Sequence, residues 1–286
     1  MAAPLVSVVI PTYNRAAVVE QAIRSVLDQT YGNLELILVD DGSTDNTRDV
    51  AAAIDDPRLR YVYQENAGAC AARNHGVALA KGEFIAFHDS DDIWCKEKLE
   101  KQMEAMEKSA CDVLFCKLAM KTREGETVVY PKYIGQGPVS RQNDIFGVGT
   151  QTVLTRAEVC REERFDEAMP RYQDFEWLYR VSGRYAVECL DEPLVEYRIG
   201  QDSISTNYGK MEAALRLFLQ KHPGVRRESP LVSMHAVRNL LEGIRGSAKA
   251  GKPRDAVQFA GLLPRYYPGL IRYLAAKRRM NPSKAR

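Results

Sequence analysis

The feature that most constrains the fold is a regular alternation, near the N-terminus, of short apolar runs with amphipathic helical patterns. Apolar residues recur at helical spacing between residues 16 and 29, whereas the run 34–45 is continuous and ends in acids and a Gly-Ser turn. The expected order is strand 5–11, helix 16–29, strand 34–45, helix 44–54, strand 58–65, helix 68–82 and strand 83–89. Strands that alternate with helices predict an α/β fold, with a mainly parallel sheet covered by helices on both faces.

Two local signals refine the helix ends. Ser43 or Thr44 is expected to cap the helix that follows the second strand, because a hydroxyl can accept a hydrogen bond from a free amide of the first turn. Gly82 is expected to close the helix 68–82, since glycine suits the backbone conformation at a helix end.

The composition is that of an ordinary globular protein. Of the 286 residues, 45% are hydrophobic and 27% are charged, which is enough to bury a core. No apolar run reaches the ~18 residues that cross a bilayer, and the N-terminus lacks the basic start of a signal peptide. The six cysteines form no CxxC pair and no zinc spacing, so we expect reduced thiols in a cytoplasmic protein.

Polar clusters follow three of the expected strands. They read "PTYN" at 11–14, "VDDGSTD" at 39–45 and "HDSDD" at 88–92. The carboxyl ends of parallel strands meet at one edge of a sheet, which is where ligands bind in α/β folds. Crowded carboxylates repel one another unless a cation joins them, and hard oxygen ligands suit Mg²⁺ or Mn²⁺. The pattern therefore indicates a metal shared with a nucleotide diphosphate, and the alternative is a solvated acidic turn.

Other motifs do not fit. A calcium loop of the EF-hand type starting at Asp89 would need glycine where Trp94 stands. The segment "GVGTQT" (147–152) has Thr152 in the third glycine position of a dinucleotide-binding loop. The four histidines show no metal-binding spacing.

Five segments in order resemble the family 2 glycosyltransferases of the GT-A fold. They are "VSVVIPTYNR", "LILVDDGSTD", "NAGACAARNHG", "GEFIAFHDSDDIW" and "YQDFEW", and the resemblance runs from about residue 5 to residue 206. It implies transfer of one sugar, with inversion, from a nucleotide diphosphate sugar to an acceptor hydroxyl. A UDP-sugar is the expected donor, and the expected acceptor is a saccharide or a lipid-linked sugar of bacterial surface polysaccharide or glycolipid assembly. A nucleic-acid partner is not expected.

Two alternatives belong to other classes of function. A sugar nucleotidylyltransferase would need an N-terminal Gly-rich loop, and "PTYNR" (11–15) supplies no glycine. A non-catalytic member of the family would bind nucleotide without turnover.

The resemblance also implies roles for residues of the nucleotide site. Tyr13 would stack on the base, and Asp41 would accept the N3–H of uracil through a charge-assisted hydrogen bond. Arg73 would hold the base or the diphosphate. The remaining expected nucleotide contacts are Pro11, Arg15, Asp89 and Ser90. Asp40 is expected to support the strand end, and Asp45 to help the next helix start.

The acidic segment 88–92 is implied to hold the metal. Asp91 would be the principal ligand of Mn²⁺ or Mg²⁺, and Asp89 would lie against the ribose or join the metal through water. Asp92 would support the ligands from behind. Trp94 would either wall the sugar pocket or belong to the core.

The segment "RYQDFEWLYRV" (171–181) is implied to carry the general base, Asp174, with Glu176 and Trp177 as acceptor contacts. Its structural alternative is a cap on a helix running from about 175 to 182. The family usually shows Glu-Asp before the aromatic residue, and here Gln173 replaces the Glu.

A second departure from the family lies in "VEYRIGQDSIS" (195–205). Gly200 stands where many relatives place a metal-binding His, so Gln201, Asp202 or water would have to substitute for it. Arg198 fits a loop that faces the diphosphate. The QxxRW motif and the membrane helices of processive synthases are absent from the sequence, so we expect one sugar per acceptor visit.

The C-terminal part lies beyond the resemblance and is basic. Helical patterns cover 210–222 and 229–252, and residues 245–286 contain eleven Lys or Arg and one acid, Asp255. We expect 1–115 to form the nucleotide-sugar half of a GT-A domain, 116–208 its acceptor half, and 209–286 a helical, basic extension. Residues 262–286, with Leu270, Ile271, Leu274 and the run 277–279, suggest peripheral contact with an anionic membrane at its inner face. The alternative is a solvated helix with a disordered tail.

Overall fold

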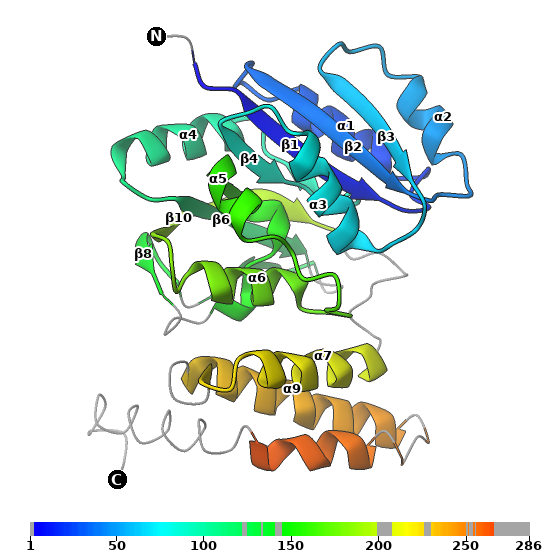
Figure 1. The fold of residues 1–286 in the computed structure, drawn as a ribbon, viewed down its shortest axis with the longest axis vertical. Helices are drawn as coiled ribbons and strands as arrows, with labels where there is room; N and C mark the ends of the chain where they lie inside the picture. The colour runs from blue at the N-terminus through cyan, green and yellow to red at the C-terminus, as the bar shows by residue number, and fades with distance from the viewer. Residues whose placement is uncertain are drawn as a thin grey trace. The chain divides into compact units, whose positions relative to one another are not determined.

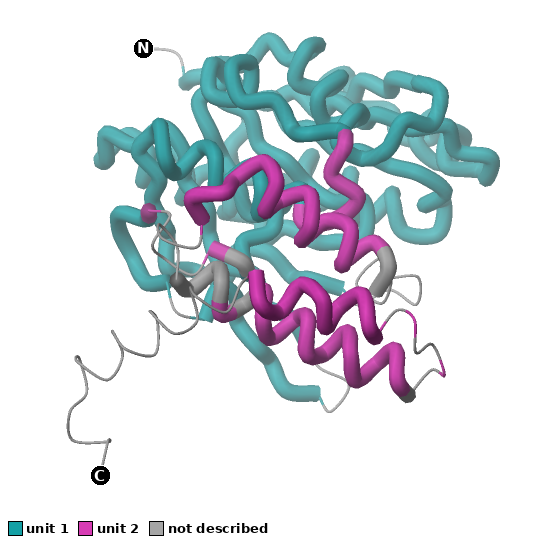
Figure 2. The backbone as a smooth tube through the Cα atoms, turned by 60° about the horizontal axis from the view of Figure 1, so that its bottom comes forward, with its two compact units in different colours: residues 1–139, 147–167, 173–201 teal, residues 140–146, 168–172, 202–286 magenta. Residues whose placement is uncertain are grey.

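The computed structural model describes residues 3–121, 125–132, 134–140, 145–198, 208–225, 230–249, 251, 254 and 256–265 (Figure 1). The chain forms two compact units, drawn in different colours in Figure 2. Unit 1 contains residues 1–139, 147–167 and 173–201, and unit 2 contains residues 140–146, 168–172 and 202–286. The assignment of the two short internal segments to unit 2 is not predicted by the sequence.

Unit 1 is built on one sheet. Its strands are β1 (Val6–Thr12), β2 (Leu34–Asp41), β3 (Leu59–Gln64), β4 (Phe84–Phe87), β5 (Ile93–Trp94), β6 (Val113–Lys121), β7 (Thr127–Tyr130), β8 (Gly137–Val139), β9 (Val153–Arg156) and β10 (Val187–Tyr197). The main path is β3-β2-β1-β4-β9-β6-β10-β5. β1 pairs in parallel with both β2 and β4, and β2 in parallel with β3, as the strand–helix alternation predicts. β9 is antiparallel to both β4 and β6, and it joins the parallel half to the second half.

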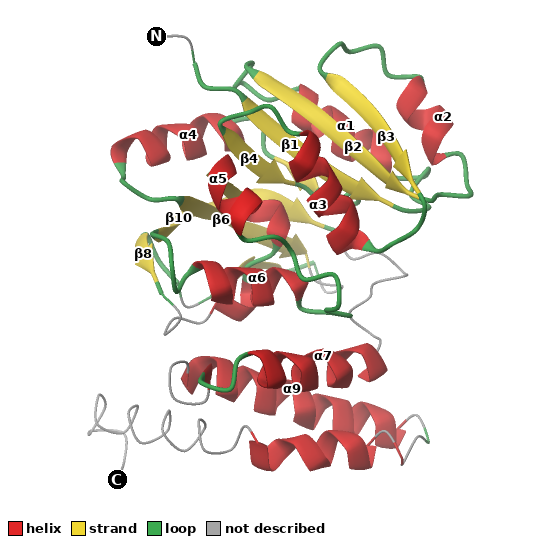
Figure 3. Cartoon of the chain, in the orientation of Figure 1, coloured by secondary structure: helices red, strands yellow, loops and turns green. Residues whose placement is uncertain are grey.

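Helices cover both faces of this sheet (Figures 1 and 3). They are α1 (Val19–Leu27), α2 (Thr47–Ala52), α3 (Ala69–Leu79), α4 (Lys98–Lys108), α5 (Ala157–Glu162) and α6 (Gln173–Val181). Ile23 of α1 and Leu99 of α4 share one core with Val8 of β1. α3 lies close to the opposite face, where a Cβ at Gly76 would come 2.4 Å from Cγ1 of Val9. Neighbouring residues of β1 therefore face opposite helix layers, as a strand fully buried in an α/β sheet requires.

The predicted helix ends are wrong in two places. α2 begins at Thr47, and the Ser43 hydroxyl accepts a hydrogen bond from the Asn14 amide, at 2.8 Å, instead of capping the helix. α3 ends at Leu79, before Gly82. A Cβ at Gly82 would lie 2.6 Å from the Leu5 carbonyl oxygen, so this glycine permits close approach to the start of β1. Both residues serve contacts between segments that sequence spacing does not reveal.

Unit 2 is helical. It contains α7 (Tyr208–Lys221) and α9 (Pro230–Lys249), which confirms the helices expected at 210–222 and 229–252, and a further helical stretch at 256–265. α7 packs against α9, with Phe218, Leu240 and Phe259 buried. None of the helices in the described part of the chain is long and apolar enough to span a membrane. Residues 266–286, half of the basic stretch 245–286, lie outside the described residues.

Candidate active site

The polar clusters meet at the edge of the sheet where the parallel strands end. Two ion pairs connect them. Arg15, after β1, approaches Asp91 with 3.8 Å between Nη2 and Oδ2, and Arg73 of α3 donates from Nη2 to Asp89 Oδ1 at 2.8 Å. The structure therefore brings together side chains from three segments that lie apart in the sequence: the loop after β1, helix α3 and the acidic segment after β4. Pro11 and Ser90, which were also predicted for this site, are buried beside the strand ends.

The end of β2 is held by its own acids. Asp40 accepts hydrogen bonds from the Ser43 amide at 2.8 Å and from the Tyr61 hydroxyl at 2.6 Å, which confirms its supporting role. Burial and this hydrogen bond raise the pKa of Tyr61. Asp45 accepts from the Thr47 amide at 3.0 Å, at the start of α2, and from the Ala16 amide at 3.0 Å. Asp45 therefore helps α2 begin, as expected, and also ties the loop after β1 to the loop after β2.

Asp41 lies inside a ring of hydrogen-bond donors. Its Oδ1 accepts from Gln64 Nε2 at 2.7 Å and from the Ala67 amide at 2.8 Å, and its Oδ2 accepts from the Gly68 amide at 2.8 Å. Gly68 has a φ of +93°, a backbone conformation that favours glycine. Tyr13, the expected stacking platform, is 48% exposed.

Two carboxyl groups of the acidic segment after β4 have raised pKa values. Burial first, and then the neighbouring Asp89, raise the pKa of Asp91. The same two causes raise the pKa of Asp92 to about 8. Asp92 is buried and accepts a hydrogen bond from the Arg198 amide at 3.0 Å, so it fastens the end of β10 to this segment. The Arg198 side chain bonds Gln21 of α1 and lies 3.6 Å from Glu196.

This arrangement fits a divalent cation. Carboxylate oxygens are the ligands that Mg²⁺ and Mn²⁺ prefer, and raised carboxyl pKa values indicate negative charge that a cation would relieve. Among the described residues no group of three His, Cys, Asp or Glu side chains could enclose a metal. An ion held by Asp89 and Asp91 would therefore take its remaining ligands from water and substrate phosphates, which is usual for Mg²⁺. Gly200, Gln201 and Asp202 lie outside the described residues.

Trp94 belongs to the core beneath the acidic segment. It is 3% exposed, and its indole N–H donates to the Gln151 carbonyl at 3.0 Å. One neighbour is the His88 ring, with 4.6 Å between centroids, and another is the Lys98 ammonium, 3.7 Å from the indole centroid. Of the two roles open to Trp94 from the sequence, the structure supports the core.

Lys98 is a buried cation that the sequence did not single out. Its ammonium donates to Gln102 Oε1 at 2.7 Å, and burial lowers its pKa to about 8. Burial and the Lys98 charge lower the pKa of His88. A lysine near the start of an amphipathic helix is ordinarily a surface residue, so no local signal distinguishes this one.

Asp174 lies in the first turn of α6, which begins at Gln173, two residues earlier than predicted. Its Oδ1 accepts from the Phe175 amide at 2.8 Å. Burial raises its pKa, Arg73 opposes this effect, and Asp89 adds to it. Asp174 therefore shares an electrostatic environment with the Arg73–Asp89 pair, and a carboxylate with a raised pKa suits a general base.

Glu176 and Trp177 do not present a surface to an acceptor. Each is 1% exposed. Glu176 accepts from Arg180 Nε at 2.8 Å, and the Trp177 indole donates to the Glu163 carbonyl at 2.6 Å while its ring stacks on Phe165. The expectation of acceptor contacts is therefore corrected, because helical spacing turns both side chains into the interior that anchors α6.

Asn74 joins the two sides of the site and was also missed. Its amide donates to the Phe165 carbonyl at 2.9 Å and to Glu167 at 2.8 Å, and its oxygen accepts from the Phe165 amide at 2.9 Å. Adjacent in α3, Arg73 holds Asp89. One turn of helix thus links the acidic segment to the chain that leads into α6.

All six cysteines are free and five of them are buried, which confirms the expectation of reduced thiols.

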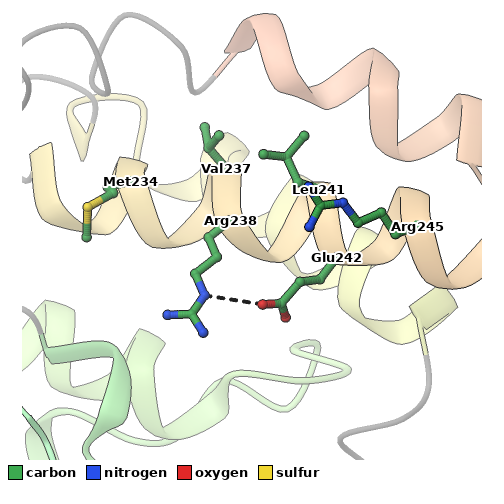
Figure 4. A pocket seen from close by; sticks show the side chains of 6 residues that line it. All are labelled: Met234, Val237, Arg238, Leu241, Glu242 and Arg245. Carbon is green, nitrogen blue, oxygen red and sulfur yellow. Dashed lines mark hydrogen bonds and ion pairs between the residues drawn. The ribbon is translucent and has the colours of Figure 1, made fainter.

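Among the described residues, a separate hollow lies on α9 of unit 2, lined by Met234, Val237, Arg238, Leu241, Glu242 and Arg245 (Figure 4). Its Arg238–Glu242 ion pair measures 3.2 Å, and the hollow shares no residue with the strand-end site.

Solved structures support the fold. Residues 1–349 of TarS from S. aureus, in complex with UDP-GlcNAc, superpose with a TM-score of 0.64 at 19% identity, covering 91% of each chain. The unit 1 sheet with its helices and C-terminal helical extension is thus the GT-A type of fold that the sequence resemblance implied.

Sequence comparisons agree with this fold. A protein named as a teichuronic acid biosynthesis glycosyltransferase, TuaG of Bacillus subtilis, is 36% identical over 213 residues, covering 72% of this chain and 84% of that protein. The Escherichia coli enzyme UDP-Glc:alpha-D-GlcNAc-diphosphoundecaprenol beta-1,3-glucosyltransferase WfgD is 45% identical over 208 residues, covering 71% of this chain and 80% of that protein. The family model described as "Glycosyl transferase family 2" matches residues 7–160. The chain therefore belongs to glycosyl transferase family 2.

Proposed function

We propose that the chain transfers one sugar from a UDP-sugar to an acceptor hydroxyl, with inversion, during assembly of a bacterial surface polysaccharide or glycolipid. The observation that carries the proposal is that Arg73 binds Asp89 and acts on the charge of Asp174, while Arg15 pairs with Asp91 in the same acidic segment. The relatives TuaG and WfgD support the biological setting, and WfgD's name specifies a UDP-sugar and a lipid-linked acceptor.

The donor would occupy the ends of β1, β2 and β4. Tyr13 stacks on the base, Asp41 accepts its ring N–H, and Arg73 and Arg15 face the diphosphate. Asp91, with Asp89, would hold Mn²⁺ or Mg²⁺. Such an ion supplies positive charge that stabilises the leaving diphosphate as the bond to the sugar breaks. Arg15 and Arg73 neutralise the same carboxylates in the free protein, which keeps the acidic segment in place before the donor arrives.

The acceptor would approach Asp174. Its carboxylate takes the proton from the acceptor hydroxyl as that oxygen attacks C1 of the sugar, on the face opposite the leaving diphosphate. Attack from the opposite face inverts the anomeric configuration. Trp177 and Glu176 contribute by anchoring α6, so that Asp174 is presented from a rigid element.

The proposal is tested by offering UDP-, TDP- and GDP-sugars to the protein with Mn²⁺ and following release of the nucleotide diphosphate. Slow release of UDP without an acceptor, and a product of inverted configuration by NMR with one, are the expected results. Bound nucleotide without turnover under every acceptor would favour a non-catalytic role. A retained configuration would overturn the mechanism.

For the acceptor we propose a lipid-linked sugar presented at an anionic membrane surface. The support is the basic composition of residues 262–286, since each Lys or Arg near an anionic surface adds roughly 1 kcal/mol of attraction. The chain would then work as a peripheral protein at the inner face of the membrane.

A further inference from the structure

The carboxylate of Asp41 has little acceptor capacity left. An ionised carboxylate offers about four lone-pair positions, two on each oxygen. Oδ1 already accepts from Gln64 Nε2 and from the Ala67 amide, whereas the one donor to Oδ2 among the described residues is the Gly68 amide. One acceptor position therefore remains, and it is on Oδ2.

The orientation of Gln64 follows from its neighbours. A carboxylate oxygen can only accept, so Gln64 must turn its NH₂ group toward Asp41, which leaves its carbonyl oxygen on the other side. That oxygen lies 2.8 Å from Nδ1 of His75, which must carry its proton there to donate. The chain His75–Gln64–Asp41 thus runs from α3 through the last residue of β3 to the last residue of β2, and register pairs Gln64 directly with Asp41.

Nucleobases differ in what they offer to a carboxylate. Uracil and thymine present one ring N–H between two carbonyl oxygens. Guanine presents a ring N–H and an exocyclic N–H side by side, a pair that matches both oxygens of a carboxylate. Cytosine and adenine present an acceptor at the corresponding ring position. With Oδ1 saturated, the second N–H of guanine would be buried without a partner, which costs free energy that uracil and thymine do not lose.

We propose that Gln64 is a specificity-determining residue, which restricts the donor to a uracil or thymine nucleotide by occupying the Asp41 oxygen that guanine requires. The inference rests on the proposed function, because it takes Asp41 as the contact to the base. His75 is a positioning residue that acts through Gln64, since its N–H binds the Gln64 carbonyl oxygen and holds the amide against Asp41.

The test compares the affinities of the full chain for UDP, TDP and GDP, measured by calorimetry with Mn²⁺ present. The wild-type chain should bind UDP and TDP and should bind GDP far more weakly. Gln64→Met keeps the length of the side chain and removes its donors. It should tighten GDP relative to UDP by about ten- to hundredfold, the range expected when one buried N–H gains a partner, and leave UDP affinity within about threefold.

Two further variants separate specificity from damage to the fold. His75→Phe should also reduce the preference for UDP over GDP, but by less than Gln64→Met does. In this variant Gln64 is still present, but its amide is no longer held by the His75 N–H. Asn66→Ala is the matched control. Asn66 donates to the main-chain oxygen of Asp41, at 2.8 Å, and not to its carboxylate, so the preference should not change.

The outcomes are distinct. An unchanged UDP-to-GDP ratio in Gln64→Met, or a wild-type chain that binds GDP as well as UDP, would overturn the role of Gln64 while leaving the donor site intact. Failure of the wild-type chain to bind any of the three nucleotides would overturn the proposed function, and the inference with it. A shift in ratio with Asn66→Ala equal to that of Gln64→Met would show a loosened loop and would also overturn the inference.

Discussion

Asp41 and Asp174 are the same residue type in two different surroundings. Asp41 is enclosed by donors from the β3–α3 connection, so its carboxylate is held in one orientation. Asp174 accepts from the Phe175 amide and is otherwise subject mainly to burial, which raises its pKa. A well-satisfied carboxylate suits recognition, whereas a poorly satisfied one suits proton abstraction.

Asp174→Asn should separate chemistry from donor binding. The amide keeps the shape of the side chain and removes its basicity. UDP affinity should be nearly unchanged, while transfer should fall by roughly 10²–10⁴-fold, the usual contribution of a general base. Nucleotide binding by calorimetry and transfer rate on the same preparation test this. A variant that retains full transfer would exclude Asp174 as the base.

The raised pKa of Asp174 also predicts opposite pH trends for activity and stability. As the proposed base, Asp174 must be ionised, so activity should be lost as pH falls through a value above the ordinary 3.8 of aspartate. In the interval between the ordinary and the raised pKa, the folded state binds more protons than the unfolded state, so the contribution of Asp174 to stability falls as pH rises. At neutral pH, Asp174→Asn should therefore raise the unfolding temperature while lowering the rate of transfer. Thermal unfolding at pH 4 and pH 7 decides this, and an equal change at both would contradict it.

At the scale of elements, the segment between β4 and α4 is fixed from several sides. Asp92 holds the end of β10, and the Gln29 side chain donates to the Cys95 carbonyl at 2.7 Å. Trp94 is packed between His88 and Lys98. Because carboxylates repel one another, an acidic loop would otherwise spread, and these contacts hold the segment that carries Asp89 and Asp91 in place.

Asp91→Ala should remove the effect of metal on UDP binding and on transfer. Transfer that requires Mn²⁺ should be abolished, and UDP binding should weaken only when metal is present, because on the proposed mechanism Asp91 contributes to donor binding through the metal. Asp49→Ala, an exposed acid in α2, is the matched control and should change neither property. Equal loss of UDP binding with and without metal would show that Asp91 supports the fold instead.

Lys98→Met should change how stability depends on pH. The pKa of Lys98 is lowered from 10.5 to about 8, so between these values the unfolded state binds more protons than the folded state. Wild-type stability relative to Lys98→Met should therefore rise with pH across that interval and level off above it. Urea unfolding of both chains from pH 7 to pH 10.5 tests the difference. A difference that does not vary with pH would mean that the Lys98 ammonium is hydrated in the folded chain.

At the scale of the whole molecule, charge is unevenly distributed along the sequence. The chain has a net charge of +2, and residues 245–286 hold eleven basic residues against one acid, or +10. Residues 1–244 therefore carry 2 − 10 = −8. An acidic body would be repelled by an anionic membrane, so only the basic segment can supply attraction to such a surface.

Membrane attachment should depend on that segment. The full chain should co-sediment with vesicles that contain anionic lipid and not with neutral vesicles, and binding should fall with added salt because the attraction is screened. A chain truncated before Pro268 should lose this binding and keep its affinity for UDP. If the full chain ignores anionic vesicles at low salt, a soluble acceptor becomes the better hypothesis.

The order of strands and helices in the first half, and the convergence of three polar strand ends, two of them acidic, follow from sequence alone. Periodicity is local information, and parallel strands separated by helices must end at the same edge. These two rules are sufficient to place Asp89, Asp91 and Asp41 in one site. They could also have found Gln64, because the expected strand 58–65 ends beside the strand that carries Asp41.

Other features depended on contacts between segments distant in sequence. The packing around each side chain decides whether Trp94 lines a pocket or lies in the core. It also decides whether Glu176 faces an acceptor or Arg180. Lys98 looks like any surface lysine until α4 turns it under the indole of Trp94. The lone pairs that remain on Asp41 can be counted only once the β3–α3 connection has closed around it, because hydrogen-bond capacity is a property of the folded neighbourhood and not of the residue.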